Sequence, residues 1–184
     1  MKKIYITNGS GTNGKDSFAR AIGKYVSTYK YSSIDLVKKM LKVIGIDEEP
    51  KTEEKRLLYS DMKDRLTKYG DIPFKDVESV VINFKNNHIN AEVLLIDIRE
   101  PEEIARAVKE FGAETILVRN PNVEKITSNH ADRDVENYNY DYIIENDGTL
   151  EQLDRVAELF SKTITRSKYV PKYHKPVVLT CSNY

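Results

Sequence analysis

The chain has 184 residues, and its 29 lysines and arginines balance 29 aspartates and glutamates to a formal net charge of +0. Without a global excess of positive charge, neither nucleic acid nor an anionic membrane is indicated as a partner. A composition of 32% charged and 40% hydrophobic residues is typical of a single soluble domain that buries a core. The lone cysteine, Cys181, excludes an intrachain disulfide framework, and no stretch reaches the ~20 apolar residues that span a bilayer. We therefore expect a cytoplasmic protein.

The first residues predict a strand over 3–7, a glycine-rich turn, and a helix over about 14–28. From Gly9 to Lys15 the spacing is G-x-x-x-x-G-K, which is typical of a phosphate-binding loop. In such a loop, backbone N–H groups surround phosphate oxygens, the lysine reaches the terminal phosphates, and the helix presents its positive end. The residues expected to bind the phosphates of ATP are Gly9, Gly11, Thr12, Asn13, Gly14, Lys15, Asp16 and Ser17.

The same turn also fits a second motif. Gly9, Gly11 and Gly14 form G-x-G-x-x-G, and Asp35 follows about twenty residues later, as in a dinucleotide-binding fold. Lys15 favours phosphate transfer, because a transferring phosphoryl group needs a cation that a bound pyrophosphate does not. A glycine-rich turn without a ligand is the third alternative.

Asp16 stands where a phosphate-binding loop usually carries the serine or threonine that binds Mg²⁺. The nearest hydroxyl belongs to Ser17. A carboxylate binds Mg²⁺ directly or through its waters, so Asp16 and Ser17 are alternative ligands. A purely structural role is also open, in which Asp16 satisfies free N–H groups at the start of the helix.

The rest of the chain alternates strand and helix patterns. Strands are expected over 29–34, 91–97, 114–118 and 140–144, and helices over 35–43, about 52–69, 74–86, 101–111 and 149–162. Repeated strand–helix units predict a parallel sheet with helices on both faces. We expect one domain over 1–163 with a helical insertion over about 45–88. The remaining residues, 164–184, form a tail that either packs on the body or mediates a contact, such as that of a homodimer.

The buried strand 91–97 ends at Asp97, as a Walker B strand does. Asp97 is a candidate for orienting a Mg²⁺-bound water. Arg99, two positions on, is expected at the same edge of the sheet, where a guanidinium can hold a phosphate through two hydrogen bonds. The alternative for Arg99 is a surface ion pair with Glu100.

Three runs resemble those of the phage-type deoxynucleoside monophosphate kinases: Gly14-Lys15-Asp16-Ser17, the segment 97–103 (DIREPEE), and the segment 144–150 (IENDGTL). Those kinases belong to a wider group of P-loop small-metabolite kinases, with the dephospho-coenzyme A kinases and animal-type phosphomevalonate kinases. The resemblance extends to about residue 163 and implies a three-layer P-loop NTPase fold with a five-stranded parallel sheet in the order 2-3-1-4-5. It implies transfer of the γ-phosphoryl of ATP, with Mg²⁺, to a (deoxy)nucleoside monophosphate. Another phosphorylated metabolite, dephospho-coenzyme A, or nucleotide binding without transfer are the alternatives.

The resemblance also implies roles for side chains outside the loop. Asp35-Leu36-Val37-Lys38 corresponds to a D-P-L-K-like run, without its proline, and a polar lid is expected over about 119–139. Asp35 would be the base for a hydroxyl acceptor, and a helix N-cap is its alternative role. The expected catalytic residues are Lys15, Arg99 and Arg133; the acceptor-binding residues are Asp35, Lys38, Arg56 and Arg99; the lid residues are Arg119 and Arg133; and the metal ligands are Asp16, Ser17 and Asp97.

Overall fold

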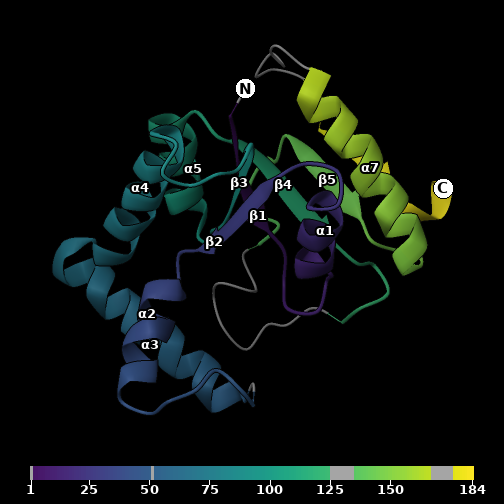
Figure 1. Ribbon diagram of the computed structural model, residues 1–184. Helices are drawn as coiled ribbons and strands as arrows, with labels where there is room; N and C mark the ends of the chain where they lie inside the picture. The colour runs from purple at the N-terminus through teal and green to yellow at the C-terminus, as the bar shows by residue number, and fades with distance from the viewer. Residues whose placement is uncertain (1, 51, 125–134, 167–175) are drawn as a thin grey trace.

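The computed structural model describes residues 2–50, 52–124, 135–166 and 176–184, and its centre is a parallel β-sheet (Figure 1). The strands are β1 (Lys3–Asn8), β2 (Thr28–Ser32), β3 (Val93–Asp97), β4 (Glu114–Arg119), β5 (Tyr142–Glu145) and β6 (Val177–Thr180). The helices are α1 (Lys15–Ile22), α2 (Asp35–Val43), α3 (Glu53–Gly70), α4 (Ile72–Lys85), α5 (Pro101–Phe111), α7 (Leu150–Arg166) and the short 3₁₀ helix η1 (Cys181–Asn183). None of the helices in these described ranges is both long and apolar enough to cross a membrane.

The sheet has six strands in the order β2-β3-β1-β4-β5-β6, and every pair is parallel. β1 lies between β3 and β4, with Ile6 opposite Ile96 in β3. All five residues of β3 are buried. Strands covered on both faces must be apolar on both sides, which explains the nearly continuous apolar run that the sequence shows there.

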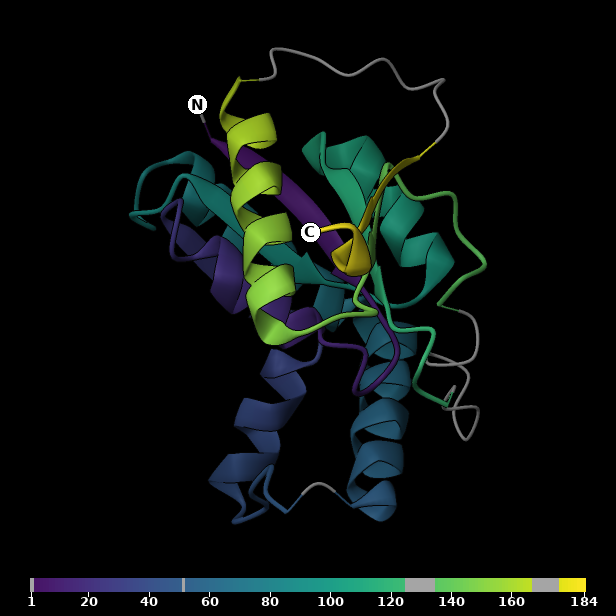
Figure 2. The same cartoon turned by 90° about the vertical axis from the view of Figure 1, so that its right-hand side faces the viewer.

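Helices cover both faces of the sheet and make three layers. On one face, α4 and α5 contribute Phe74, Phe84 and Ile104 to a core that includes Ile6 and Ile96 of the sheet. On the other face, α1 and α7 lie side by side (Figure 2) and form the second core with the opposite side chains of the strands. The predicted three-layer α/β architecture is therefore confirmed.

In the second core, aromatic side chains of α1, α7 and the sheet meet at one point. The ring of Phe160 from α7 packs edge-on against Tyr5 of β1, with 5.5 Å between ring centroids, and against Tyr142 of β5 at 5.1 Å. Phe18 of α1 contacts the same Phe160 ring at 5.7 Å. These contacts fix α1, and with it the loop that precedes α1, against the middle of the sheet.

The sequence-based prediction of five strands is wrong at one edge of the sheet. The order 2-3-1-4-5 holds for the first five strands, but β6 pairs with β5, where Val178 lies opposite Ile143. The sequence predicts a tail for these residues, because a segment of only four residues carries a weak strand pattern. Pairing with β6 satisfies backbone groups that β5 would otherwise leave unpaired at an edge.

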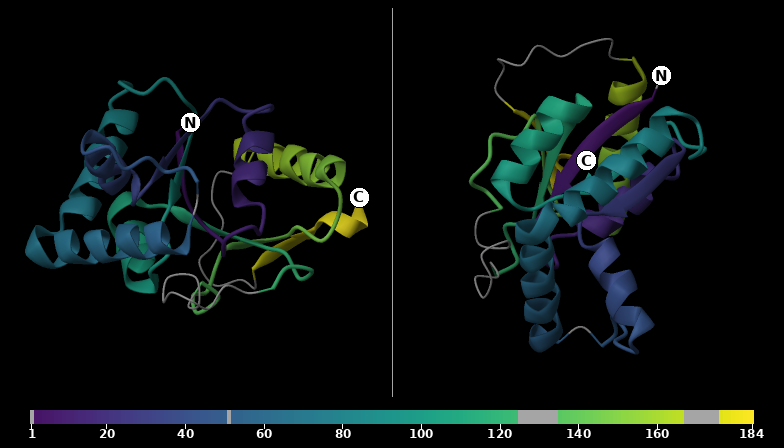
Figure 3. Two further views of the ribbon diagram at one scale, coloured as in Figure 1. Left: turned by 90° about the horizontal axis from the view of Figure 1, so that it is seen from below. Right: turned by 90° about the vertical axis from the view of Figure 1, so that its left-hand side faces the viewer.

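The helical segment between β2 and β3 divides into two parts. α2 and α3 project away from the sheet as an arm (Figures 2 and 3) and share a small core of Val37, Leu41 and Tyr59. α4 instead packs on the sheet. The arm projects at the end of the sheet where the loop between β1 and α1 lies (Figure 2).

Helix α1 ends earlier than the sequence predicts, at Ile22 and not near residue 28. Gly23 is its C-cap, and Val26 continues a turn by donating its backbone N–H to the Ile22 carbonyl. The chain must reverse here because β2 already begins at Thr28.

The strand order decides between the two glycine-rich motifs. In a dinucleotide-binding fold, β1 and β2 are neighbours, which brings the acid after β2 close to the glycine turn. Here β3 lies between β1 and β2, so Asp35 does not follow a strand adjacent to β1. The topology therefore favours the phosphate-binding loop.

Candidate functional site

The glycine-rich turn leads from the end of the central strand β1 into α1. Gly14 has a φ of 90°, in the left-handed region that favours glycine. A Cβ on Gly14 would lie 2.2 Å from Asn146 Nδ2, and a Cβ on Gly9 would lie 2.6 Å from the Val118 carbonyl oxygen. Both glycines therefore allow close approach of other segments. Asn146 also donates its side-chain amide to the Asn13 carbonyl at 3.1 Å, which links the turn to the segment after β5.

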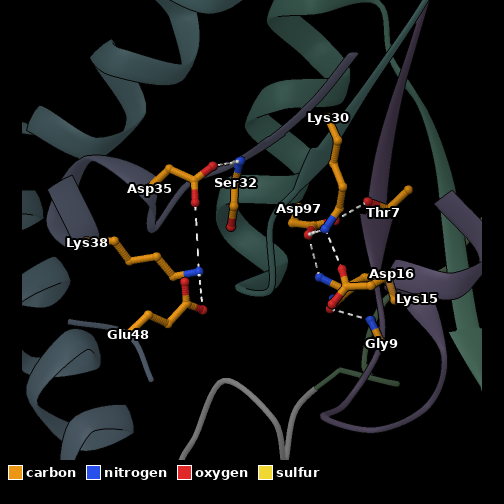
Figure 4. Close-up of polar contacts among 11 residues, drawn as sticks. Thr7, Gly9, Lys15, Asp16, Lys30, Ser32, Asp35, Lys38, Glu48 and Asp97 are labelled. Carbon is orange, nitrogen blue, oxygen red and sulfur yellow. Dashed lines mark hydrogen bonds and ion pairs between the residues drawn. The ribbon is translucent and has the colours of Figure 1, made fainter. Parts of the chain in front are cut away.

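Lys15 and Asp97 meet at the carboxyl ends of neighbouring strands. Lys15 is the first residue of α1, and its Nζ lies 2.7 Å from Oδ2 of Asp97, the last residue of β3 (Figure 4). Their side chains are 13% and 6% exposed. Thr7, which lies opposite Asp97 in the β1–β3 register, donates its hydroxyl to the other Asp97 oxygen. The structure thus brings together two residues that the sequence predicted for one site.

A second lysine, which the sequence alone did not indicate, completes this cluster. Lys30 of β2 contacts Asp97 at 2.8 Å and also binds the Asp16 carboxylate (Figure 4). The Lys30 side chain is 36% exposed, whereas that of Asp16 is 70% exposed. The pairing of β2 with β3 places Lys30 here. In that register Ser32 lies opposite Asp97, and Lys30, two residues earlier in β2, is on the same face of the strand as Ser32. The sequence shows no more than a lysine within a weak strand pattern.

The two lysines keep the neighbouring carboxylates ionised. Burial opposes ionisation of Asp97, but the charges of Lys15 and Lys30 outweigh it and lower the pKa of Asp97. Partial burial also opposes ionisation of Asp16, but the hydrogen bond from Lys30 outweighs it and lowers the pKa of Asp16. Burial lowers the pKa of Lys15, and the Arg99 guanidinium acts in the same direction, although Asp97 opposes both. Arg99 is thus within electrostatic reach of the loop lysine, and its role in holding a phosphate stays a prediction.

The oxygen atoms at this place suit Mg²⁺, which prefers carboxylates, hydroxyls and water. The carboxylates of Asp16 and Asp97 already converge on one cation, the Lys30 ammonium. The Ser17 hydroxyl lies next to Asp16 in α1 and accepts a hydrogen bond from Arg20 at 3.3 Å. The donor set fits the metal, and the assignment of Asp16, Ser17 and Asp97 as ligands stays a prediction.

Asn8 connects the turn to two other segments. Its buried side chain accepts the Gly9 N–H at 2.8 Å and donates to the Arg99 carbonyl at 3.2 Å and to the Tyr140 hydroxyl at 2.7 Å. The Tyr140 hydroxyl in turn donates to the Val135 carbonyl at 2.6 Å. Asn8 therefore holds the start of the turn, the backbone at Arg99 and the chain before β5 in one arrangement.

Asp35 and Lys38 form a second polar cluster at the base of the arm. Asp35 accepts the Ser32 N–H at 2.9 Å, and Lys38 lies 3.8 Å from Asp35 and 2.9 Å from Glu48 (Figure 4). Asp35 is in the first turn of α2, and Ile34 is the N-cap, so the alternative N-cap role predicted for Asp35 is wrong. Burial raises the pKa of Asp35, and the charge of Asp97 adds to this, although Lys38 and the Ser32 N–H oppose it. The two clusters are therefore electrostatically coupled.

The other arginines selected from the sequence lie in different places. Arg56 is exposed on α3, in the arm. Arg119 ends β4 and forms an ion pair with Glu145 of β5. Arg133 of the expected lid lies outside the described residues. The roles of these residues at the site stay predictions.

A buried lysine ties the arm to the loop that carries Arg99. Lys63 of α3, whose side chain is 7% exposed, contacts Glu100 at 2.6 Å and Glu103 at 2.8 Å. Glu100 is therefore paired with Lys63 of another helix, which the sequence did not show, because Lys63 looks like any charged residue of an amphipathic helix. The predicted alternative for Arg99, a surface pair with Glu100, would have to share this carboxylate with Lys63.

The segment after β5 is held by the end of the chain. Ser182 donates its backbone N–H to Asp147 at 2.9 Å and its hydroxyl to the same carboxylate at 2.6 Å. Thr180 donates to Glu145 at 3.1 Å. Asn146, between these two acids, contacts the glycine-rich turn, so β6 and η1 stabilise the turn indirectly by holding this segment in place.

No protein-family model and no curated protein sequence matches the chain. Among solved structures, it is similar to a shikimate kinase from Aquifex aeolicus, with 12% identity over 88% of this chain and 98% of that chain, and a TM-score of 0.49. A sugar kinase from a Janibacter species is similar at 8% identity over 99% of this chain and 87% of that chain, with a TM-score of 0.40. An LAO/AO transport system kinase has 14% identity over 97% of this chain and 52% of that chain, with a TM-score of 0.35. Likenesses this weak establish neither a family nor a substrate.

Proposed function

We propose that the chain is a phosphotransferase that moves the γ-phosphoryl of ATP to a small acceptor, a nucleoside or deoxynucleoside monophosphate. One observation carries the proposal: Lys15, after the glycine-rich turn of β1, lies 2.7 Å from Asp97 at the end of the adjacent parallel strand β3. A lysine at the start of a helix, beside an acid at the end of the neighbouring strand, matches what a bound triphosphate requires, namely a cation for its terminal oxygens and an oxygen ligand for its metal.

The loop residues would act by position and charge. Lys15 exchanges its contact with Asp97 for the β- and γ-phosphates, and follows the charge that develops on the transferred group. The left-handed Gly14 and the N-terminus of α1 direct backbone N–H groups toward the same oxygens. Asp97, kept ionised by its lysines, is then available to the metal together with Asp16 or Ser17. When bound, Mg²⁺ would neutralise part of the negative charge of the phosphates.

The acceptor would lie between the arm and Arg99. Lys38 supplies a cation at the base of the arm, and Arg99 and Arg56 are the arginines proposed to hold the acceptor's phosphate. An acceptor phosphate is already an anionic nucleophile, so no general base is needed. If the acceptor is a hydroxyl, as in dephospho-coenzyme A, the raised pKa of Asp35 suits a base at this place.

The deciding experiment follows ADP release by purified protein with Mg²⁺ and ATP. The acceptor panel contains nucleoside and deoxynucleoside monophosphates, dephospho-coenzyme A and a phosphorylated non-nucleotide metabolite. Lys15→Met tests the site, and Lys24→Met is the matched control, because Lys24 forms an exposed ion pair with Asp154 on the surface. Monophosphate-stimulated release that Lys15→Met abolishes and Lys24→Met retains supports the proposal.

Two other outcomes would change the assignment. Stimulation only by dephospho-coenzyme A or by the non-nucleotide metabolite would keep the phosphotransferase and replace the acceptor. ATP binding without release for any acceptor would indicate a nucleotide-binding protein without transfer activity. Absence of ATP binding would refute the proposal altogether.

A further inference from the structure

Lys30 occupies an unusual place in the site. Its ammonium contacts both Asp97, at 2.8 Å, and Asp16, and these two acids come from different elements, the end of β3 and the first turn of α1 (Figure 4). A lysine that served only to neutralise Asp97 would be redundant, since Lys15 already lies 2.7 Å from the same Asp97 oxygen. What Lys30 adds is the link to Asp16.

The two carboxylates therefore already flank a cation, the Lys30 ammonium. The Asp97 side chain is 6% exposed, and a buried carboxylate without a nearby positive charge is costly. A divalent ion that enters between Asp16 and Asp97 would meet the Lys30 ammonium within a few ångströms, and like charges at that distance repel strongly. The ammonium and a metal ion cannot both occupy this position.

We propose that Lys30 is an internal counter-cation that holds the place of the metal between Asp16 and Asp97 until nucleotide arrives. The inference rests on the proposed function, since the metal enters with the triphosphate. The β2 strand is at the edge of the sheet, and the Lys30 side chain is 36% exposed, so its long side chain has room to leave. The incoming phosphates add the negative charge that lets Lys30 and the metal coexist nearby.

The consequence is a condition on metal binding. The protein without nucleotide should bind divalent ions weakly, because the Lys30 ammonium already occupies the position between the two acids. A variant that lacks this charge should bind them without nucleotide. Lys30 thus couples the metal to the nucleotide and is a positioning residue for both.

The test measures Mn²⁺ binding in the absence of any nucleotide, by the electron paramagnetic resonance signal of free Mn²⁺. Lys30→Met is expected to bind Mn²⁺ about tenfold or more tightly than the unmodified protein. Lys30→Arg, which keeps the charge, should bind as weakly as the unmodified protein. Adding Asp16→Asn to Lys30→Met should remove the gain, which locates the ion between the two acids.

Lys24→Met controls for the loss of one positive charge elsewhere on the surface, and circular dichroism with thermal unfolding confirms that each variant is folded. An unchanged Mn²⁺ affinity in folded Lys30→Met would overturn the inference. So would tight Mn²⁺ binding by the unmodified protein, or an equal gain in Lys24→Met. Because this measurement contains no nucleotide, its result is independent of the acceptor panel, and failure of the proposed function there is recognised separately.

Discussion

Replacing Lys63 by methionine should destabilise the protein through the two carboxylates that it leaves behind. Methionine keeps most of the length and the apolar character of the side chain but removes the charge that lies 2.6 Å from Glu100 and 2.8 Å from Glu103. Breaking a buried ion pair from one side costs about 3–5 kcal/mol. The two glutamates are 25% and 17% exposed, so water screens part of this penalty. We expect a loss of about 2–3 kcal/mol in the free energy of unfolding.

Urea unfolding followed by circular dichroism measures this loss directly, and the melting temperature should fall by about 5–10 °C for a chain of this size. Lys162→Met is the matched control. Lys162 pairs with Glu158 one helical turn away on the surface of α7, and such pairs contribute about 0.3–0.5 kcal/mol. Combining Lys63→Met with Glu100→Gln and Glu103→Gln should restore most of the stability, because no unpaired charge then remains.

The loss of stability caused by Lys63→Met should also depend on pH. In the unmodified protein, burial opposes ionisation of Glu100, but Lys63 lowers the pKa of Glu100 below its usual range. That contribution to stability is present above the unfolded pKa and is lost as the pH falls through the folded one. In Lys63→Met, burial without a cation favours protonation, so the difference between the two proteins should shrink from pH 7 toward pH 4. A loss below about 0.5 kcal/mol at pH 7, no larger than that of the surface control, would refute the reasoning.

Three further changes test the site itself. Gly14→Ala places a methyl group at a φ of 90° against the side-chain amide of Asn146, and it should abolish binding of a fluorescent ATP analogue. Gly112→Ala is the control: at a φ of 70° with open space around it, it should cost about 1 kcal/mol of stability and leave binding unchanged. Equal effects of the two variants on binding would contradict this role for the turn. Tyr140→Phe removes the hydroxyl that accepts a hydrogen bond from the buried side-chain amide of Asn8. In urea titrations the free energy of unfolding should fall by about 1–3 kcal/mol. An unchanged urea midpoint would contradict this expectation. Ser182→Ala removes one of the two hydrogen bonds that Ser182 donates to Asp147. We expect ATP-analogue binding to weaken by a few-fold and the protein to lose about 1 kcal/mol of stability. An unchanged affinity for the ATP analogue would show that the chain end does not support the turn.

The sequence predicted those parts of the fold that depend on neighbours along the chain. Thr52 caps α3 by accepting the Lys55 N–H at 3.2 Å, and Pro101 and Gly112 bound α5 as their backbone preferences require. The glycine spacing before Lys15 gave the turn and the helix that follows it. Capping, φ preferences and apolar periodicity act over a few residues, and for this reason they can be recognised without a structure.

The short sixth strand shows where that reasoning ends. Val177–Thr180 has four apolar or β-branched residues, which alone do not distinguish a strand from a tail segment. Its pairing with β5 depends on α7, which carries the chain back along the sheet in a crossover. A segment this short becomes a strand only because an unpaired edge is available to it.

Some residues of the candidate site could be predicted from the sequence, whereas others are found only in the tertiary structure. By itself, the sequence determined that Lys15 follows a glycine turn and that Asp97 ends a buried strand, because each conclusion needs only local pattern. The tertiary structure decided which charges meet them. Lys30 reaches Asp16 and Asp97 through the register of β2 on β3, and Asn146 reaches the turn from a segment 133 residues away along the chain. Register and long-range contacts arise from the packing of the whole sheet, so no local pattern in the chain encodes them.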